Sequence, residues 1–252
     1  MGYKTDEEVQ ARLQEHLNYF NKDIGEEFFG IFIYGSWNLG LEYEDSDVDS
    51  YIVFLPSDGA NNCAKTFSFK NNEKIIAIPL STFYRNLKEQ QIMVLQLLFS
   101  KFYIINPKYL ELWNFLLNNR EGIAKLNSEK IKKSILERLN TTKNLYFNPT
   151  PEYSYLYEAR GYDTKRPYCM YYLYLLSKKL STGTPYGEAL DLSQFRQELI
   201  NIKRGNISEE EATSLLLTSY EKAIQEIKNI PNSQTDLKLE RELFIRLCML
   251  QY

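Results

Sequence analysis

FIYGSWNLGLEYEDSDVDSYIVF, residues Phe32–Phe54, consists of two apolar runs separated by a short polar segment. The first run ends at Tyr34, and the second covers Val48–Phe54. Aromatic and β-branched residues in runs of this length are typical of buried strands. Gly35 and Ser36 end the first run, as residues that favour turns do. The stretch therefore predicts two core strands joined by a polar loop.

Two carboxylates, Asp47 and Asp49, lie at the start of the second strand. Because side chains alternate along a strand, we expect the two on one face, about 6–7 Å apart along the backbone, with Val48 facing the core. Carboxylates this close repel each other unless a cation lies between them. Mg²⁺ prefers such oxygen ligands and fills its other positions with water and phosphate oxygens. The pattern favours a metal site over its alternative, a solvated acidic turn across residues 42–49.

Gly35 and Ser36 are candidate phosphate contacts at the other end of the loop. A glycine lets the backbone come close to a phosphate, and Ser36 offers a hydroxyl and an amide. Ten residues separate Ser36 from Asp47. The combination of strand, Gly-Ser, spacer, Asp-x-Asp and strand is more specific than any of its parts.

Hydrophobic spacing predicts the elements around this stretch. The N-terminal part is expected to contain a helix at Asp6–Phe20, strands at Phe28–Tyr34 and Val48–Phe54, and a hairpin formed by Thr66–Phe69 and Lys74–Ile78. The helical pattern then begins at Leu80 and recurs at Tyr109–Leu117, Glu129–Leu145, Lys165–Leu180, Ser193–Ile202, Glu209–Ile227 and Asp236–Leu250. Ser208 and Glu211 form a candidate capping box. We expect an α/β (α+β) sheet domain over residues 1–118 and a helical domain over residues 119–252.

The composition excludes several kinds of chemistry. The one histidine, His16, is expected at the surface or boundary of the first helix, and the three cysteines are too far apart for a CxxC pair or a zinc finger. The remaining candidates for catalytic groups are the carboxylates of Asp and Glu. The cysteines indicate reduced thiols, and no apolar stretch approaches the length of a membrane span. These features predict a cytoplasmic protein with no membrane partner.

The Gly35-Ser36 and Asp47-x-Asp49 pattern resembles the signature of the polymerase-beta-like nucleotidyltransferase superfamily. Leu80–Phe99, Gly161–Lys165 and Ile202–Asn206 are similar to its bacterial and phage branch of predicted nucleotidyltransferases, sometimes called RlaP-like. The likeness loosely covers most of the chain, and the Gly-Ser and Asp-x-Asp motif is its specific part. It implies a nucleotidyltransferase-type sheet domain followed by a helical domain. It also implies that carboxylates hold Mg²⁺ or Mn²⁺ and align the triphosphate of an NTP, with Asp47 and Asp49 as catalytic metal ligands.

The chain departs from that family at the third carboxylate. The resemblance implies an acid on the third strand, where Lys74 stands, and Glu73 just before it is a doubtful ligand because a shift of one residue reverses side-chain direction. The branch has a glutamate where this chain has Gln96, and it has histidines where this chain has Arg166 and Cys169. Either Glu73 reaches the metal, or the site keeps two carboxylates and catalyses slowly or not at all.

Three cations near the start of a helix, Arg160, Lys165 and Arg166, are candidate nucleotide-binding residues. They flank Asp163, and charge-assisted contacts to a triphosphate or an RNA-like acceptor are strong. The alternative is a salt-bridged, exposed start of a helix. Cys169, Tyr171 and Tyr172 are expected in the core.

The predicted function is transfer of an NMP from an NTP, ATP by default, to a hydroxyl acceptor. An RNA or tRNA end, a protein side chain and a small molecule all stay open as acceptors, as do the base preference and the oligomeric state. The net charge of −3 disfavours long duplex nucleic acid. The alternative is a catalytically degenerate nucleotidyltransferase fold that binds nucleotide or RNA.

Overall fold

The computed structural model describes residues 5–44, 46–57, 63–70, 73–151, 154–233 and 236–248. The chain divides into two compact units, one made of Met1–Leu126 with Gln234–Tyr252 and the other of Asn127–Ser233. The first is an α+β unit and the second is helical. The boundary expected after Asn118 differs from this division, because it falls inside the helix α5 (Leu110–Ala124). The last helix, α12 (Leu237–Cys248), belongs to the first unit rather than to the helical one.

The first unit is built on a mixed five-stranded sheet of order β3-β4-β2-β1-β5. Its strands are β1 (Glu27–Tyr34), β2 (Asp49–Leu55), β3 (Lys65–Ser68), β4 (Lys74–Pro79) and β5 (Tyr103–Ile105). β1 is antiparallel to β2 and β5, β3 is antiparallel to β4, and β2 runs parallel to β4. The predicted core strands and the β3–β4 hairpin are thus present, and β5 was not predicted.

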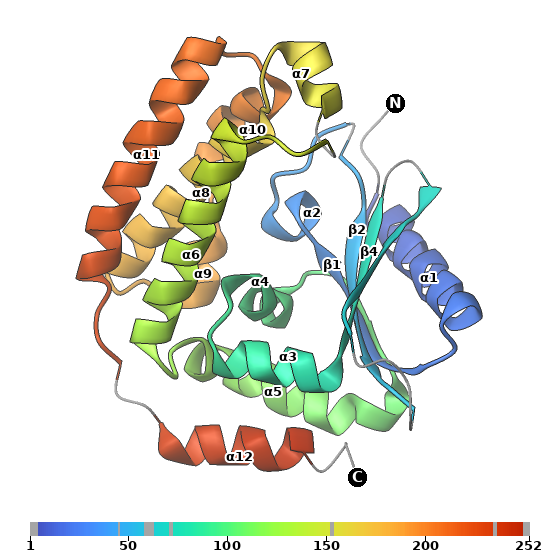
Figure 1. Ribbon diagram of the computed structural model, residues 1–252. Helices are drawn as coiled ribbons and strands as arrows, with labels where there is room; N and C mark the ends of the chain where they lie inside the picture. The colour runs from blue at the N-terminus through green and yellow to red at the C-terminus, as the bar shows by residue number, and fades with distance from the viewer. Residues whose placement is uncertain are drawn as a thin grey trace. The chain divides into compact units, whose positions relative to one another are not determined.

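Helices cover both faces of this sheet (Figure 1). The helices of this unit are α1 (Asp6–Asp23), α2 (Ser36–Leu39), α3 (Leu80–Lys88), α4 (Ile92–Leu95), α5 and α12, with 3₁₀ turns at Gln96–Phe99 and Pro107–Tyr109. α1 covers one face, and α3 and α5 cover the other. The site described below therefore has a helical layer on each side of the strands that carry it.

α1 packs on the sheet through one apolar stripe. Val9, Leu13, Leu17 and Phe20 recur at helical spacing and are buried against Ile31, Ile33, Ile52 and Ile75 of the strands. Full burial of each such side chain contributes about 1.5–3 kcal/mol. Thr5 and Glu8 form a capping box that fixes where the helix begins.

The opposite face of the sheet is aromatic. Phe29 and Phe32 of β1 contact Trp113 of α5 at ring-centroid distances of 6.4 and 5.0 Å, and Phe29 also contacts Phe83 of α3. The β1–β2 register shifts between Phe28 and Gly30, so that Phe29 turns toward this cluster. Because β2 pairs with β1, the face of β1 that packs on α1 also determines which face of β2 does so.

The second unit is a group of helices around α8 (Lys165–Ser181). The others are α6 (Ser128–Phe147), α7 (Ser154–Arg160), α9 (Tyr186–Leu190), α10 (Arg196–Arg204) and α11 (Glu209–Asn229), with a 3₁₀ turn at Ser193–Phe195. α8 packs against α6 and α11, which also pack against each other. The capping box of Ser208 and Glu211 is confirmed at the start of α11. In the parts of the chain that the structure describes, no helix has the length and apolar character to cross a bilayer.

Candidate functional site

β1 ends in a glycine turn that only glycine adopts without strain. Gly35 has φ 73° and ψ −141°, and Ser36 begins the single-turn helix α2, which closes at Gly40 with φ 68°. Part of the loop that the sequence predicts is therefore helical. Trp37 is buried in the sheet core, and its Nε1 donates to the Ser46 carbonyl oxygen at 3.4 Å. This contact ties the turn to the segment that carries the two aspartates.

The Asp49 carboxylate lies between this turn and the start of β4. Asp49 is the first residue of β2 and pairs with Tyr34, the last residue of β1. Its Oδ1 accepts a hydrogen bond from the Lys74 backbone N–H at 2.8 Å. Its Oδ2 is 3.8 Å from the position that a Cβ on Gly35 would occupy. Three strands that are separate in sequence thus meet at one half-buried carboxylate.

Asp47 precedes β2 and is exposed to solvent. Burial alternates from there: Val48 and Ser50 are fully buried, whereas Asp49 is half-buried. Val48 belongs to the core under α1, and Ser50 contacts that helix. The alternation agrees with the expectation that Asp47 and Asp49 share the face that looks away from α1.

Glu73 does not contribute a third carboxylate to this face. It is 1% exposed, and its Oε2 lies 3.1 Å from His16 Nε2 and 3.5 Å from Arg12 Nε, both on α1. The doubtful assignment of Glu73 as a metal ligand beside Asp49 is therefore wrong. The physical reason is the strand alternation that made it doubtful: Glu73 points to the face opposite Asp49.

His16 was also misplaced by the sequence, which predicted a surface or boundary position. Its side chain is fully buried, and both ring nitrogens have partners: Ser50 Oγ is 2.9 Å from Nδ1, and Glu73 Oε2 is 3.1 Å from Nε2. The ring also meets Phe69 edge-on at 4.8 Å. His16 lies on the apolar stripe of α1, and a buried polar side chain needs hydrogen-bond partners. The sequence does not show which residues those partners are, so it did not indicate the buried network.

Lys74 stands beside Asp49 on the neighbouring strand. The β2–β4 register pairs Ser50 with Ile75, which places Lys74 next to Asp49 and on the same face. Lys74 is half-buried. A cation therefore occupies the position where the resemblance implies an acid.

The resemblance implies that Asp47 and Asp49 hold Mg²⁺ or Mn²⁺. Within the described ranges, no group of three or more His, Cys, Asp or Glu side chains is placed to hold a metal ion. The two carboxylates of Asp47 and Asp49 satisfy what Mg²⁺ takes from a protein when phosphate and water complete its shell. The described residues thus fit one such ion bound together with a nucleotide.

The cations predicted in the helical part lie in the second unit and differ in their surroundings. Arg166 is buried, and its Nε donates to Asp163 Oδ2 at 3.2 Å. Lys165, half-buried at the start of α8, donates its backbone N–H to Asp163 Oδ1 at 2.9 Å. Arg160 is exposed at the end of α7. The alternative interpretation, a salt-bridged start of a helix, therefore applies to Asp163 and Arg166. Both residues are buried, however, and not exposed as that interpretation expects.

Several described tyrosines of this unit donate structural hydrogen bonds. Burial is the main cause that raises the pKa of Tyr146, Tyr157 and Tyr162 above 10, so these phenols stay protonated. Tyr162 donates to the Ile207 carbonyl oxygen at 2.8 Å, and Tyr172 is buried as expected. Tyr171 is half-buried and donates to Glu198 at 2.8 Å, so it is less of a core residue than the sequence predicted.

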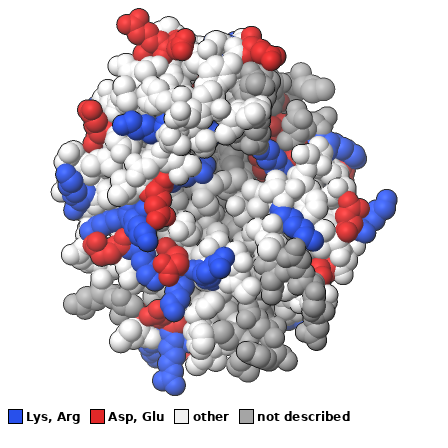
Figure 2. Space-filling view, in the orientation of Figure 1, with Lys and Arg blue, Asp and Glu red and all other residues white. Residues whose placement is uncertain are grey.

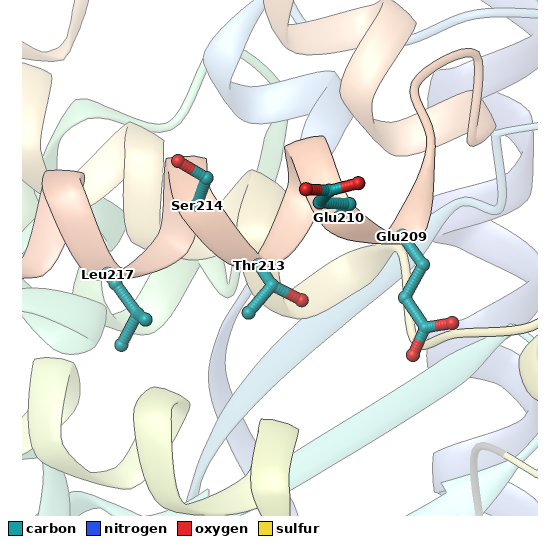
Figure 3. A pocket seen from close by; sticks show the side chains of 5 residues that line it. All are labelled: Glu209, Glu210, Thr213, Ser214 and Leu217. Carbon is teal, nitrogen blue, oxygen red and sulfur yellow. The ribbon is translucent and has the colours of Figure 1, made fainter.

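One open pocket of the second unit was not predicted by the sequence. Figure 3 shows its lining on α11: Glu209, Glu210, Thr213, Ser214 and Leu217. Two carboxylates make this surface unsuited to phosphate. Over the described part of the face in Figure 2, Lys and Arg side chains are interspersed with Asp and Glu, so that no extended basic surface forms there.

No protein-family model matches this chain, and no curated protein matches it at a significant level.

Proposed function

We propose that the first unit is the catalytic domain of a nucleotidyltransferase that moves an NMP from an NTP, ATP by default, to a hydroxyl acceptor. The observation that carries the proposal is the placement of the Asp49 carboxylate, held between the Gly35 turn and the first residue of β4. Asp47 precedes it by two residues on a mixed α+β scaffold. This arrangement supports the nucleotidyltransferase-type fold that the motif resembles.

In this proposal Asp47 and Asp49 hold a single Mg²⁺ or Mn²⁺ ion. When bound, the ion supplies positive charge for the triphosphate and for the in-line displacement. The Gly35 turn lets phosphate approach the backbone, and Ser36 offers its hydroxyl and amide. Lys74 adds a positive charge on the same face as the single metal ion, so it partly takes the place of a second metal ion.

The transfer exchanges one phosphorus–oxygen bond for another. The acceptor hydroxyl oxygen bonds to the α-phosphorus, the bond to the bridging oxygen breaks, and pyrophosphate leaves while the hydroxyl proton passes to solvent. The mixed surface charge supports a short RNA end, a tRNA end, a protein side chain or a small molecule as the acceptor rather than a long duplex.

The direct test is label transfer from each of the four α-³²P-labelled NTPs, with Mg²⁺ or Mn²⁺, to total cellular RNA and protein. We expect transfer by the wild type and its loss in Asp47→Asn and Asp49→Asn. Glu44→Gln is a matched control, because Glu44 is an exposed carboxyl of the same loop. Equal transfer by all three variants would overturn the assignment of the site.

A second candidate function is nucleotide binding without transfer, which Lys74 in place of an acid favours. It predicts that an NTP with Mg²⁺ raises the melting temperature, because a ligand that binds only the folded state stabilises it by mass action. Binding with no transfer under any condition would favour this candidate over the enzyme.

A further inference from the structure

The one histidine of the chain is the centre of a buried hydrogen-bonded chain that joins three elements. His16 of α1 contacts Ser50 of β2 through Nδ1 and Glu73, next to β4, through Nε2, at 2.9 and 3.1 Å. A carboxylate accepts only, so Nε2 donates to the Glu73 carboxylate, and the direction of the bond between Nδ1 and Ser50 depends on whether Nδ1 carries a proton. All three residues are at most 1% exposed. Arg12 adds a cation 3.5 Å from the same Glu73 oxygen.

Serine, histidine and acid in this order also occur in nucleophilic enzymes, where a substrate must reach the serine. Here Ser50 and His16 are fully buried between β2 and α1. No acyl group can approach Ser50 Oγ in this arrangement. The chain of hydrogen bonds therefore points to positioning rather than to covalent chemistry.

Each partner of His16 is the sequence neighbour of a group in the candidate site. Ser50 follows Asp49, and Glu73 precedes Lys74. The Asp49 Oδ1 to Lys74 N–H bond joins β2 to β4 on one face, and the chain through His16 joins the same two segments on the other. Movement of Ser50 or Glu73 is transmitted through a single peptide unit to the Asp49 carboxylate or to the Lys74 amide.

We propose that His16 is a positioning residue for the Asp49 carboxylate. Its two hydrogen bonds fix the spacing between the starts of β2 and β4, and this spacing sets where the Asp49 oxygens lie relative to the Gly35 turn. The inference rests on the proposed function for its catalytic consequence. Its structural consequence, protection of the Lys74 amide, is independent of that function.

Three variants of the full chain separate the two bonds. His16→Asn keeps an amide near the place of Nδ1 and Ser50, His16→Gln keeps one near the place of Nε2 and Glu73, and His16→Phe keeps the ring without either bond. Leu17→Ala is the control, because it removes buried packing of the same helix and leaves the hydrogen bonds in place. All are compared at temperatures where the fraction of folded protein is equal.

The first readout is hydrogen exchange at the Lys74 amide in ¹⁵N-lysine-labelled protein. We expect exchange about tenfold faster in His16→Phe than in Leu17→Ala, with the Asn and Gln variants between them, since one hydrogen bond changes an equilibrium by about this factor. Equal exchange in His16→Phe and Leu17→Ala would overturn the positioning role.

The second readout is transfer of labelled NMP. We expect kcat to fall about tenfold in His16→Phe, partial rescue in His16→Gln, and little change in the KM for NTP, because a misplaced carboxylate weakens the transition state more than the ground state. Absence of transfer in the wild type would contradict the proposed function alone, and the Lys74 exchange rates would then decide whether His16 positions β4. A loss of kcat in Leu17→Ala equal to that in His16→Phe would overturn the catalytic consequence.

Discussion

The two oxygens of Asp49 have different surroundings, and this difference sets what the residue can do. Oδ1 is fixed by the Lys74 amide, whereas Oδ2 faces the Gly35 turn. A carboxylate held by one oxygen presents the other in a defined direction, which lowers the reorganisation needed to bind a ligand. The hydrogen bond from the Lys74 amide thus gives this half-buried carboxylate a defined orientation.

At Gly35 we expect an alanine substitution to lower both stability and nucleotide binding. A side chain at φ 73° and ψ −141° is strained by about 1–3 kcal/mol, and its Cβ would lie 3.8 Å from Asp49 Oδ2, where phosphate is proposed to approach. Gly183→Ala is the control, since Gly183 also has a positive φ, of 79°, and belongs to the second unit. Urea denaturation and the melting shift produced by an NTP with Mg²⁺ are the measurements. A lost nucleotide shift in Gly183→Ala as well would contradict the local explanation.

Lys74→Asp places a further carboxylate next to Asp49. Without metal, repulsion between the carboxylates is expected to lower the melting temperature, and with Mn²⁺ the same cluster is expected to bind more tightly than the wild type does. Lys65→Asp makes the same charge change on β3. Melting curves over a Mn²⁺ series check the prediction, and a larger Mn²⁺ shift in Lys65→Asp than in Lys74→Asp would refute it.

At the start of β2, the sequence predicted that Val48 faces the core while Asp47 and Asp49 share the other face, because spacing along a strand determines which side chains share a face. The partners of His16 were not predicted, because Ser50 and Glu73 are 34 and 57 residues away from it. Such contacts depend on how the strands pair, which local spacing does not contain.

Among the elements, long and strongly periodic segments were predicted, whereas the short elements α2 and β5 were not. The core strands and long helices such as α6, α8 and α11 follow the expected spacing. α2 and β5 have four and three residues, too few for a hydrophobic periodicity to be recognised. They form because neighbours hold them: Asn38 Nδ2 donates to the Gln96 carbonyl oxygen at 3.3 Å, and β5 pairs with β1.

The start of α11 predicts a pH dependence of stability. The backbone N–H of Ser208, followed by its hydroxyl, donates to Glu211 and holds the pKa of that carboxyl below its usual value of 4.5. As the pH falls below about 4.5, the unfolded state takes up the proton first, so the contribution to stability is lost as the pH passes through the lower, folded-state pKa.

Glu211→Gln keeps the capping hydrogen bonds and removes this titration. We expect its melting temperature to fall less than that of the wild type between neutral pH and pH 3. Glu210→Gln, an exposed neighbour outside the capping box, is the control. Parallel wild-type and Glu211→Gln curves over the acid range would show that the cap does not contribute.

At the scale of the whole molecule, the chain returns to the first unit after the helical unit. The first unit needs the returning helix, α12, to complete its structure. α12 packs on α3 and α5, with Leu243 and Leu247 each 1% exposed. Gly122 of α5 permits this contact, because a Cβ there would meet Leu239 Cδ2 at 2.8 Å. The α+β unit is therefore complete only with a helix that follows the entire helical unit in sequence.

Leu243→Ala is expected to cost about 2–5 kcal/mol, through lost burial and the cavity that remains. The effect should appear as faster hydrogen exchange in peptides from α3 and α5, with peptides from α8 and α11 less affected. Ile245→Ala, at a position that is 39% exposed, is the control and should cost less. A uniform loss of protection across both units would show that they unfold as one.

The position of α12 also has a consequence for synthesis on the ribosome. Domains commonly fold as they emerge, the N-terminal one first, at about 5–20 residues per second. Here the sheet with its aspartates emerges first but waits about 5–20 s, while the second unit of roughly 110 residues is made, before its last helix exists. During that interval the apolar surfaces of α3 and α5 that α12 later covers are open to chaperones and to neighbouring nascent chains. The helical unit, made of one continuous segment, has no such delay and can close first although it is synthesised second.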